Sequence, residues 1–179
     1  MSEEAIKCAV EGRNLTEMAN LKNYHFSFLV GMSLTAFHQA IRQRTWNHSS
    51  QSLEDVAKRG EYVVPEKIAK SDFVEEYNDL TREGIDYVLH GEDRESVLVL
   101  PQSVKIYDLI HINGWNAINS IGKRTCLEAQ WEIRNICNLI SKYINEISPE
   151  LGKYSVPQGR IYGECPEGKK CGYCKNSKT

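Results

Sequence analysis

One long segment with a helical repeat of apolar residues constrains the fold of this chain most strongly. Between Trp115 and Ile147, apolar residues recur at steps of three and four, namely Ala129, Ile133, Ile136, Ile140, Ile144 and Ile147. This spacing matches the period of an α-helix with one buried face. We therefore predict that residues 115–147 form one helix or two stacked helices, with all six apolar residues facing the core.

The N-terminal half of this segment is also rich in polar residues. The stretch NSIGKRTCLEAQWEIR, residues 119–134, contains Asn119, Arg124, Glu128, Gln130, Glu132 and Arg134. Polar groups on the buried side of a helix must find partners, because an unpaired buried group costs free energy. Two interpretations remain open: an exposed charged face with pairs four residues apart, or the lining of a site for a planar, hydrogen-bonding ligand.

Composition and charge limit the class of protein. The chain has 179 residues, of which 41% are hydrophobic and 26% charged, as in a globular domain with its own core. A net charge of -2 gives no general attraction to nucleic acid or anionic membranes. No apolar run is long enough to span a bilayer, and the start, MSEEAIKCAV, does not resemble a signal peptide. We expect a cytoplasmic protein whose partners include neither nucleic acid nor membrane.

Shorter patterns predict the other elements of the first half. Residues 24–30 alternate as a strand that ends at Gly31, and Ser33 is a plausible N-cap for a helix over 34–44 with Leu34, Phe37 and Ile41 inward. Residues 45–51 have the composition of a loop, and residues 53–60 that of a second helix.

The second half continues with a surface helix and two strand patterns. We predict a helix over 70–91, with Asp72 and Glu75 as a capping box and an inner stripe of Phe73, Tyr77, Leu80 and Val88. Residues 97–100 and 104–112 are predicted as strand, with Asp108 on the apolar side of the second.

The order of these elements predicts an α+β fold in which helices cover an antiparallel sheet. We divide the chain into a short or reduced N-terminal segment at 1–23, an α+β domain at 24–148 and an irregular, cysteine-rich tail at 149–179.

The six cysteines are more consistent with thiols or metal ligands than with disulfides in a cytoplasmic chain. Cys165, Cys171 and Cys174 follow the spacing Cys-x5-Cys-x2-Cys. This resembles part of a zinc site, but zinc needs four ligands and no histidine is nearby. We treat these three as weak metal candidates and predict plain thiols. Cys126 lies two residues after Arg124, whose charge can lower a thiol pKa, although a small core residue is the simpler interpretation.

Several motifs follow one another in the order found in a known enzyme family. Residues 124–134, RTCLEAQWEIR, resemble the segment L-R-x-x-x-x-A-Q-x-E-I-R. Residues 39–55 resemble Q-x-x-R-H-R-x-x-S-x-N-E-x-S-x-R-Y, in a variant containing R-T-W, and VLPQS at 99–103 resembles A-R-x-V-L-P. Together with residues 63–65 and the ending GECPEGKKCG, these stretches are similar to the flavin-dependent thymidylate synthases over residues 24–172.

The resemblance implies both an activity and an assembly. A member of that family converts dUMP to dTMP with methylenetetrahydrofolate as methyl donor, FAD as cofactor and NADPH as reductant, and it uses no cysteine nucleophile. The implied fold is an α+β homotetramer with active sites between subunits.

The resemblance also assigns roles to individual positions. Arg124 matches the catalytic arginine beside the uracil ring, where a fixed guanidinium stabilises charge as C5 becomes nucleophilic. The positions that match dUMP-binding residues are Gln39, Arg42, Ser50, Ser52 and Arg124. The positions that match FAD-binding residues are Arg42, Gln43, Arg44, Ser49, Asn113, Asn119 and Glu128.

The chain departs from the family pattern at several of these positions. Gln43 and Glu128 replace histidines, Glu54 and Val97 replace arginines of the long motif and of A-R-x-V-L-P, and Trp115 replaces a flavin arginine. Arg94 is close in sequence to the second lost arginine. These departures favour an alternative: a paralogue with a lost or altered reaction that binds nucleotide or flavin, or serves as partner subunit of a complete synthase.

Overall fold

The computed structural model describes residues 2–91, 94–166, 168, 171–172 and 174. The chain forms two compact units. The first contains residues 1–28, 43–47 and 110–179, and the second contains residues 29–42 and 48–109. The predicted domain at 24–148 therefore contributes to both units.

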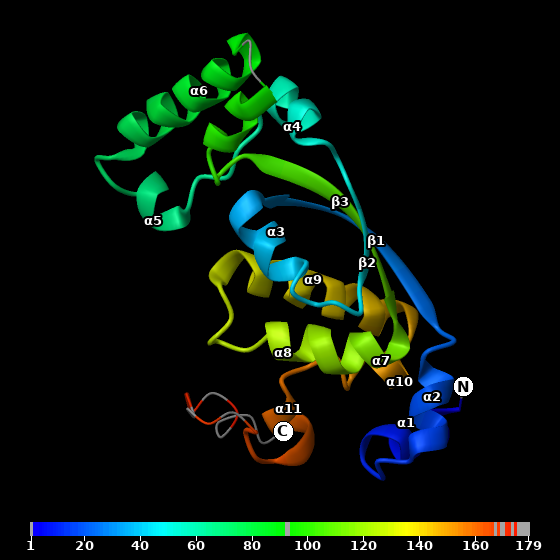
Figure 1. Cartoon of the computed structure of the whole chain (residues 1–179). Coiled ribbons are helices and arrows are strands. Elements are labelled where there is room, and N and C mark those ends of the chain that lie inside the picture. Colours follow the sequence, from blue (N-terminus) through cyan, green and yellow to red (C-terminus); the bar gives the residue numbers. More distant parts are fainter. Residues whose placement is uncertain (1, 92–93, 167, 169–170, 173, 175–179) are drawn as a thin grey trace. The chain divides into compact units, whose positions relative to one another are not determined.

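A small antiparallel sheet of three strands confirms the predicted α+β class. Its strands are β1 (His25–Ser33), β2 (Asn47–Ser50) and β3 (Lys105–Asn113), in the order β1-β3-β2 (Figure 1). On β3, Ile106, Asp108, Ile110 and Ile112 are all buried, as their alternation predicted. The predicted end of β1 at Gly31 is wrong, because the strand continues to Ser33.

Gly31 allows β1 to approach the side chains of β3 closely. A Cβ at this position would lie 2.7 Å from the Lys105 Cε atom and 3.0 Å from the Tyr107 ring. The glycine therefore serves the packing of the strand instead of ending it. The loop predicted over 45–51 is also wrong in part, because four of its residues form β2.

The first unit is mostly helical. Its helices are α1 (Glu3–Val10), α2 (Leu15–Leu21), α7 (Gly114–Asn116), the π-helix η2 (Ala117–Ile121), α8 (Gly122–Arg124), α9 (Trp131–Ile147), α10 (Pro149–Gly152) and α11 (Gln158–Tyr162). Helix α9 packs along η2 and α8 (Figure 1). The N-terminal segment at 1–23 thus contains two short helices, each capped by a side chain, from Ser2 and Asn14.

The long apolar segment forms two helical stretches separated by a turn, one of the two predicted arrangements. Gln130 ends the turn, since its Oε1 accepts hydrogen bonds from the backbone N–H groups of Glu132 and Ile133, both at 2.9 Å. Side-chain capping of this kind satisfies the first donors of a helix. The buried stripe of α9 consists of Ile133, Cys137, Ile140 and Ile144. Each buried isoleucine contributes about 1.5–3 kcal/mol relative to exposure.

The prediction that Ile147 faces the core is wrong. Its side chain is 70% exposed, and Leu139 and Tyr143 on the same helix are 57% and 53% exposed. These three residues follow at steps of four, so they form one apolar stripe on a second face of α9.

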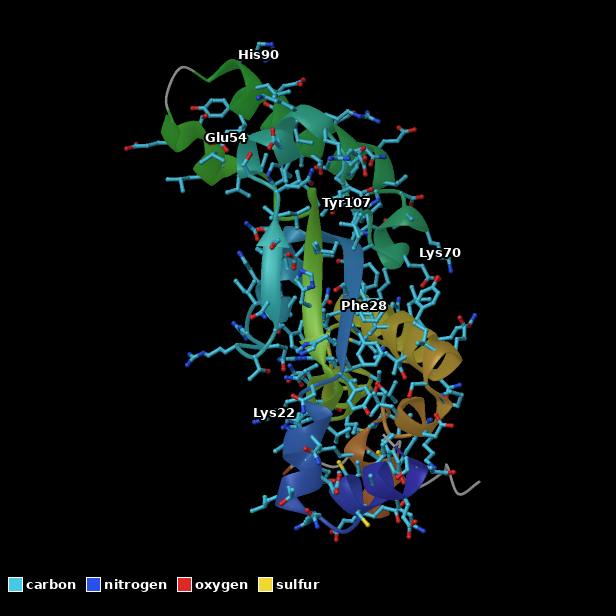
Figure 2. The ribbon with its side chains drawn as sticks, turned by 90° about the vertical axis from the view of Figure 1, so that its right-hand side faces the viewer. Lys22, Phe28, Glu54, Lys70, His90 and Tyr107 are labelled. Carbon is cyan, nitrogen blue, oxygen red and sulfur yellow. The ribbon has the colours of Figure 1, made fainter. Side chains whose placement is uncertain are left out.

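The second unit holds α3 (Leu34–Ala40), α4 (Leu53–Arg59), α5 (Glu66–Ala69), α6 (Val74–His90) and the 3₁₀-helix η1 (Arg94–Val99). Ser33 caps α3 as predicted, because its Oγ accepts a hydrogen bond from the Ala36 N–H at 3.1 Å. The helix nevertheless ends four residues before the predicted Arg44, and Ile41, predicted inward, is 44% exposed. Lys70, which follows α5 and pairs with Glu66, projects into solvent (Figure 2).

Helix α6 differs from its prediction at its start and on its buried face. It begins at Val74, and no side chain caps it, so the predicted capping box is absent. Phe73 and Leu80, predicted inward, are 64% and 59% exposed, whereas Thr81 and Ile85 are buried. The strand predicted at 97–100 is also wrong, because these residues belong to or directly follow η1. No helix among the described residues is both long and apolar enough to cross a membrane.

Close packing of α10 against α9 offers a test of the fold of the first unit. A Cβ at Gly152 would lie 2.3 Å from the Cα and 2.7 Å from the N atom of Asn145. Because backbone cannot move aside as a side-chain end can, Gly152→Ala should lower the free energy of unfolding by about 1–3 kcal/mol. Urea denaturation followed by circular dichroism measures this change.

Gly168→Ala is the matched control, since no atom of a described residue lies within 4 Å of its Cβ position. Equal unfolding midpoints for the two variants would contradict the packing described for α10.

Candidate functional site

In the first unit, the segment Gln43–Asn47 is hydrogen-bonded along one face of the helical stretch 114–124. Its partners are Asn116, Ser120 and Arg124, which follow at steps of four residues. Residues at this spacing share a helix face. We call the segment Gln43–Asn47 the 43–47 strap. Its contacts join two stretches of chain that lie more than 60 residues apart in the sequence.

Arg124 is held by Gln43 at one end of the strap. With the Gln43 amide turned so that its oxygen faces the guanidinium, Oε1 accepts from Arg124 Nη2 at 2.6 Å and from Nε at 3.0 Å. An amide orientation is assigned from such partners, and this orientation satisfies both groups. Both side chains are half-buried. The guanidinium is therefore fixed in the unit, with its remaining donors available to a ligand.

Asn116 anchors the middle of the strap through both ends of its amide. The Thr45 hydroxyl donates to Asn116 Oδ1 at 2.8 Å, and Asn116 Nδ2 donates to the Thr45 carbonyl oxygen at 3.0 Å. Asn116 is only 3% exposed. A buried amide that makes both bonds avoids the cost of an unpaired polar group.

The indole of Trp46 is buried against the same face. Its Nε1–H donates to Ser120 Oγ at 2.6 Å, and the Ser120 hydroxyl donates in turn to the Asn116 carbonyl at 2.8 Å. Ser120 lies in the π-helix η2. Helices of this type are rare in proteins, and those that occur are often found at functional sites. Sequence reasoning did not identify Thr45, Trp46, Asn116 or Ser120 as site residues. The R-T-W sequence was the available signal.

Of the other predicted flavin-binding residues of the first unit, two are hydrogen-bonded to neighbouring residues and two are exposed. Asn113 Oδ1 accepts from the Asn116 N–H at 2.9 Å and so caps α7. Asn119 Oδ1 accepts from Gln158 Nε2 at 2.9 Å. Arg44 is exposed and makes no hydrogen bond or ion pair with a described residue, and Glu128 is exposed in the turn before α9. Both asparagines keep amide hydrogens that no described residue accepts.

The remaining polar residues of the 119–134 cluster mainly serve the turn between α8 and α9. Gln130 caps α9, and Arg134 Nη1 donates to the Leu127 carbonyl at 3.0 Å. Glu132 is only 7% exposed. The interpretation as an exposed face with charge pairs therefore fails for these residues, because Gln130 and Arg134 bond to backbone atoms and Glu132 is buried.

The predicted dUMP- and FAD-binding residues of the second unit lie on α3 and just after it, on β2, and at the N-cap of α4. Gln39 is half-buried on α3, and Arg42 is exposed and unpaired among the described residues. Ser49 and Ser50 are exposed on β2, and Ser50 lines a pocket of about 310 Å³ together with Phe37, His38 and Leu100.

Ser52 has a structural role that the motif did not predict. Its Oγ accepts from the Asp55 N–H at 3.1 Å and donates to Asp55 Oδ2 at 2.9 Å, so it caps α4. Glu54 lies in the first turn of α4, where an acid suits the positive end of the helix dipole. The side chain of Arg94 lies outside the described residues.

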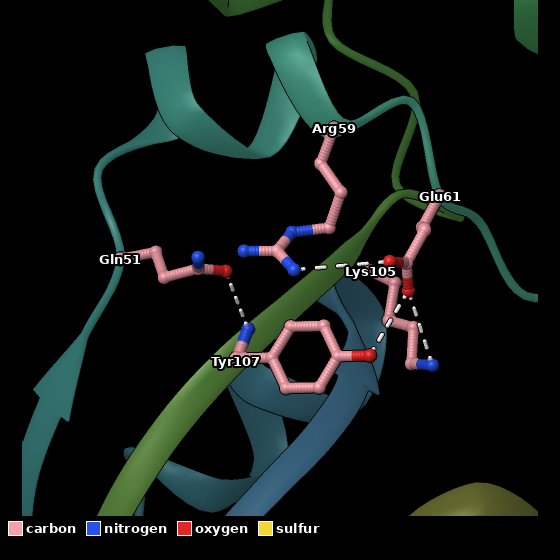
Figure 3. A network of polar contacts seen from close by, with 5 residues as sticks. All are labelled: Gln51, Arg59, Glu61, Lys105 and Tyr107. Carbon is pink, nitrogen blue, oxygen red and sulfur yellow. Dashed lines mark hydrogen bonds and ion pairs between the residues drawn. The ribbon is translucent and has the colours of Figure 1, made fainter.

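A polar network stabilises the chain between Gln51 and β3 (Figure 3). Gln51 Oε1 accepts from the Tyr107 N–H at 3.1 Å, and the Tyr107 hydroxyl donates to Glu61 Oε2 at 3.0 Å. Lys105 Nζ lies 3.3 Å from the same oxygen, and the Arg59 guanidinium stacks 4.7 Å from the Tyr107 ring centre. The Tyr107 hydroxyl, followed by Lys105, lowers the pKa of Glu61. The network fixes the backbone from which Ser52 and α4 begin.

Asp108 and His48 form a buried pair in the second unit. His48 Nδ1 lies 2.6 Å from Asp108 Oδ2, and the His48 ring meets Phe37 edge-on. Asp108 is fully buried, and its Oδ1 has no hydrogen-bond partner among the described residues. The pair explains how β3 accommodates a carboxylate on its apolar side.

Comparisons with known proteins place the chain among relatives with a shared name. The profile of the family described as "Thymidylate synthase complementing protein" matches residues 16–150. The flavin-dependent thymidylate synthase of Clostridium tetani is 28% identical over 178 aligned residues, covering 85% of this chain and 71% of the relative. That of Pyrococcus furiosus is 30% identical over 165 residues, covering 82% and 67%.

The hydrogen bond between Trp46 and Ser120 generates a prediction about the strap. Trp46→Phe removes the indole donor and part of a buried ring, so the free energy of unfolding should fall by about 1–3 kcal/mol. Guanidinium denaturation measures the loss. Trp131→Phe is the control, because Trp131 is 39% exposed and should change stability little. A Trp46→Phe variant as stable as the wild type would show that the indole does not anchor the strap.

Proposed function

The chain belongs to the thymidylate synthase complementing protein family, and from that premise we propose that it is a flavin-dependent thymidylate synthase. The proposed reaction transfers a one-carbon unit from methylenetetrahydrofolate to C5 of dUMP and gives dTMP, with NADPH as reductant. The observation that carries the proposal is the fixed Arg124 guanidinium, which is half-buried and hydrogen-bonded to Gln43.

Arg124 is suited to act on a pyrimidine ring. Two of its nitrogens are committed to Gln43, which leaves the other N–H groups in a fixed direction. A cation held in place stabilises negative charge on a uracil oxygen as C5 becomes nucleophilic, without reorganising during the reaction. Lysine would not supply the same planar set of donors.

The residues present also fit a flavin. Asn113 and Asn119 have their carbonyl oxygens engaged and their amide hydrogens available, which suits the oxygen and nitrogen acceptors of a flavin ring. Arg44 is an exposed cation without a partner among the described residues, which suits a phosphate. We propose Arg42, Gln43, Ser49 and Glu128 as further flavin contacts. Bound FAD would supply the hydride chemistry that the side chains of this chain lack.

For dUMP we propose Gln39, Arg42, Ser50, Ser52 and Arg124 as the binding residues. Arg42 is exposed and unpaired among the described residues, so its guanidinium is available to bind a phosphate. Ser52 can bind a phosphate only if its hydroxyl gives up the bond to Asp55. Glu54 adds a negative charge beside it. We therefore expect weaker dUMP binding than in a relative with arginine at this position.

We propose that the chain forms a homotetramer with active sites between subunits, and the exposed apolar stripe of α9 supports a contact between copies. Leu139, Tyr143 and Ile147 expose more than half of each side chain. Burial of such a stripe against a second copy is a common use of an apolar helix face. We propose this face as part of the contact between subunits.

The proposal predicts that the purified protein carries flavin and that Arg124 is required for pyrimidine binding. The protein should be yellow, and added dUMP should perturb the flavin spectrum. Arg124→Ala should abolish this perturbation, while analytical ultracentrifugation still detects a tetramer.

Arg134→Ala is the matched control, because Arg134 contacts only the turn at Leu127 among the described contacts. A colourless protein that cannot be loaded with FAD would remove the proposed activity. An unchanged dUMP response in Arg124→Ala would show that the site lies elsewhere.

The acid at position 54 provides a second prediction. Glu54→Arg replaces a carboxylate that repels the dUMP phosphate by a guanidinium that donates hydrogen bonds to it. A charge-assisted hydrogen bond contributes about 1.5–3 kcal/mol. The Kd for dUMP measured by calorimetry should therefore fall about tenfold or more. Glu75→Arg makes the same charge change in the first turn of α6 and should leave the Kd unchanged. Equal affinities of the two variants would place the phosphate away from α4.

A further inference from the structure

The pocket of the second unit that Ser50 lines has an uncharged lining. It has a volume of about 310 Å³, and its walls come from α3, β2, the start of α4, η1 and β3. Its most buried residues are Leu34, Leu100 and Ile106. None of the described residues that line it is Asp, Glu, Lys or Arg. Ligand pockets measure about 300–1,000 Å³, so this one suits a small molecule.

Neutral polar side chains stand beside this apolar floor. Gln51 Oε1 accepts a hydrogen bond from the Tyr107 N–H at 3.1 Å, which leaves the N–H groups of the Gln51 amide for a ligand (Figure 3). The Ser50 hydroxyl and the Gln102 amide also line the pocket, and they make no hydrogen bond with a described residue. Hydroxyl and amide groups both donate and accept. They therefore match the hydroxyls of a sugar and the polar edge of a pyrimidine.

The charges of α4 that follow directly on the lining are negative. Leu53 lines the pocket and begins α4, and Glu54 and Asp55 are the next two residues (Figure 2). Asp55 also accepts the hydrogen bond of the Ser52 hydroxyl, at 2.9 Å. An anion that enters an uncharged pocket loses hydration without gaining a partner, and nearby carboxylates repel it. The pocket therefore favours a neutral ligand over a phosphate.

Arg42 does not reverse this preference. It lies two residues after the end of α3, is exposed, and does not line the pocket. It can hold a phosphate only outside the pocket, where solvent and salt screen its charge and an ion pair contributes little.

We infer that this pocket binds a pyrimidine nucleoside without a phosphate group, represented by 2′-deoxyuridine, at least as tightly as dUMP. The choice of a pyrimidine rests on the proposed function, through Ser50. The preference for a neutral ligand rests on the uncharged lining and on the acids beside it. The 5′-phosphate, which a nucleotide site normally uses for recognition, adds no affinity here.

The experiment compares 2′-deoxyuridine with dUMP by isothermal titration calorimetry of the full chain in the presence of FAD. The titrations are made at pH 8, to exclude a contribution from histidine charge. We expect the Kd for deoxyuridine to equal that for dUMP or to lie below it. A Kd for dUMP about tenfold or more below that for deoxyuridine, a difference of about 1.4 kcal/mol, overturns the inference. Absence of deoxyuridine binding also overturns it.

A charge placed at the rim of the pocket tests where the ligand binds. Leu98 lines the pocket and is 81% exposed, so Leu98→Arg should leave the fold intact. The new guanidinium should lower the Kd for dUMP about tenfold and leave that for deoxyuridine unchanged. Leu80→Arg is the matched control, because Leu80 is 59% exposed on α6 and does not line the pocket. Equal effects of the two variants on dUMP binding would show that the ligand lies elsewhere.

Failure of this inference is distinguishable from failure of the proposed function. A yellow protein that binds dUMP much more tightly than deoxyuridine keeps the proposed function and overturns the inference. A protein that takes up no FAD but binds deoxyuridine at least as tightly as dUMP removes the proposed function and keeps the preference for a neutral ligand.

Discussion

The hydrogen bonds that the Arg124 guanidinium donates to Gln43 Oε1 are the interaction on which the candidate site depends. A free arginine side chain has many rotamers, and fixing it costs conformational free energy. Two bonds to one amide oxygen, together with partial burial, meet that cost during folding instead of during ligand binding. The strap residues Thr45 and Trp46 hold the backbone of Gln43 in register with the helix that carries Arg124. The site is thus preorganised by packing.

The replacement of histidine by Gln43 has a physical consequence. A histidine accepts a hydrogen bond from a cation only while its ring is neutral, and it titrates near neutral pH. An amide oxygen accepts at every pH. Arg124 is therefore held equally well in weakly acidic and alkaline solution. The departure from the family motif keeps a partner for the guanidinium and removes a titratable group.

Much of the fold could be predicted from local patterns, and the failures have identifiable causes. The alternation of β1 and β3 and the apolar repeat of α9 survive in the structure because burial on one face dictates them. Strand β2 was missed because its sequence, Asn-His-Ser-Ser, has no alternation of apolar residues that would indicate a strand. The inward prediction for Ile147 failed because helical spacing shows that a stripe exists but not which stripe meets the core.

For the candidate site too, the sequence did not reveal which residues lie next to one another. Motif order made Arg124 a candidate, whereas the strap joins residues more than 60 positions apart, and no local pattern reveals such a contact. Ser52 has the motif position of a ligand residue and the local geometry of a helix cap. The sequence supplies candidate residues of this kind. Only the surrounding residues in the structure show whether such a side chain binds a ligand or caps a helix.

A double-mutant cycle between Gln43 and Arg124 tests the central claim most directly. The free energies of unfolding of the wild type, Gln43→Ala, Arg124→Ala and the double variant are measured by urea denaturation. If the amide holds the guanidinium, the coupling energy between the two positions should be about 1 kcal/mol or more. Effects that add to within about 0.3–0.5 kcal/mol would show that the two side chains do not interact, and would contradict the account of a preorganised arginine.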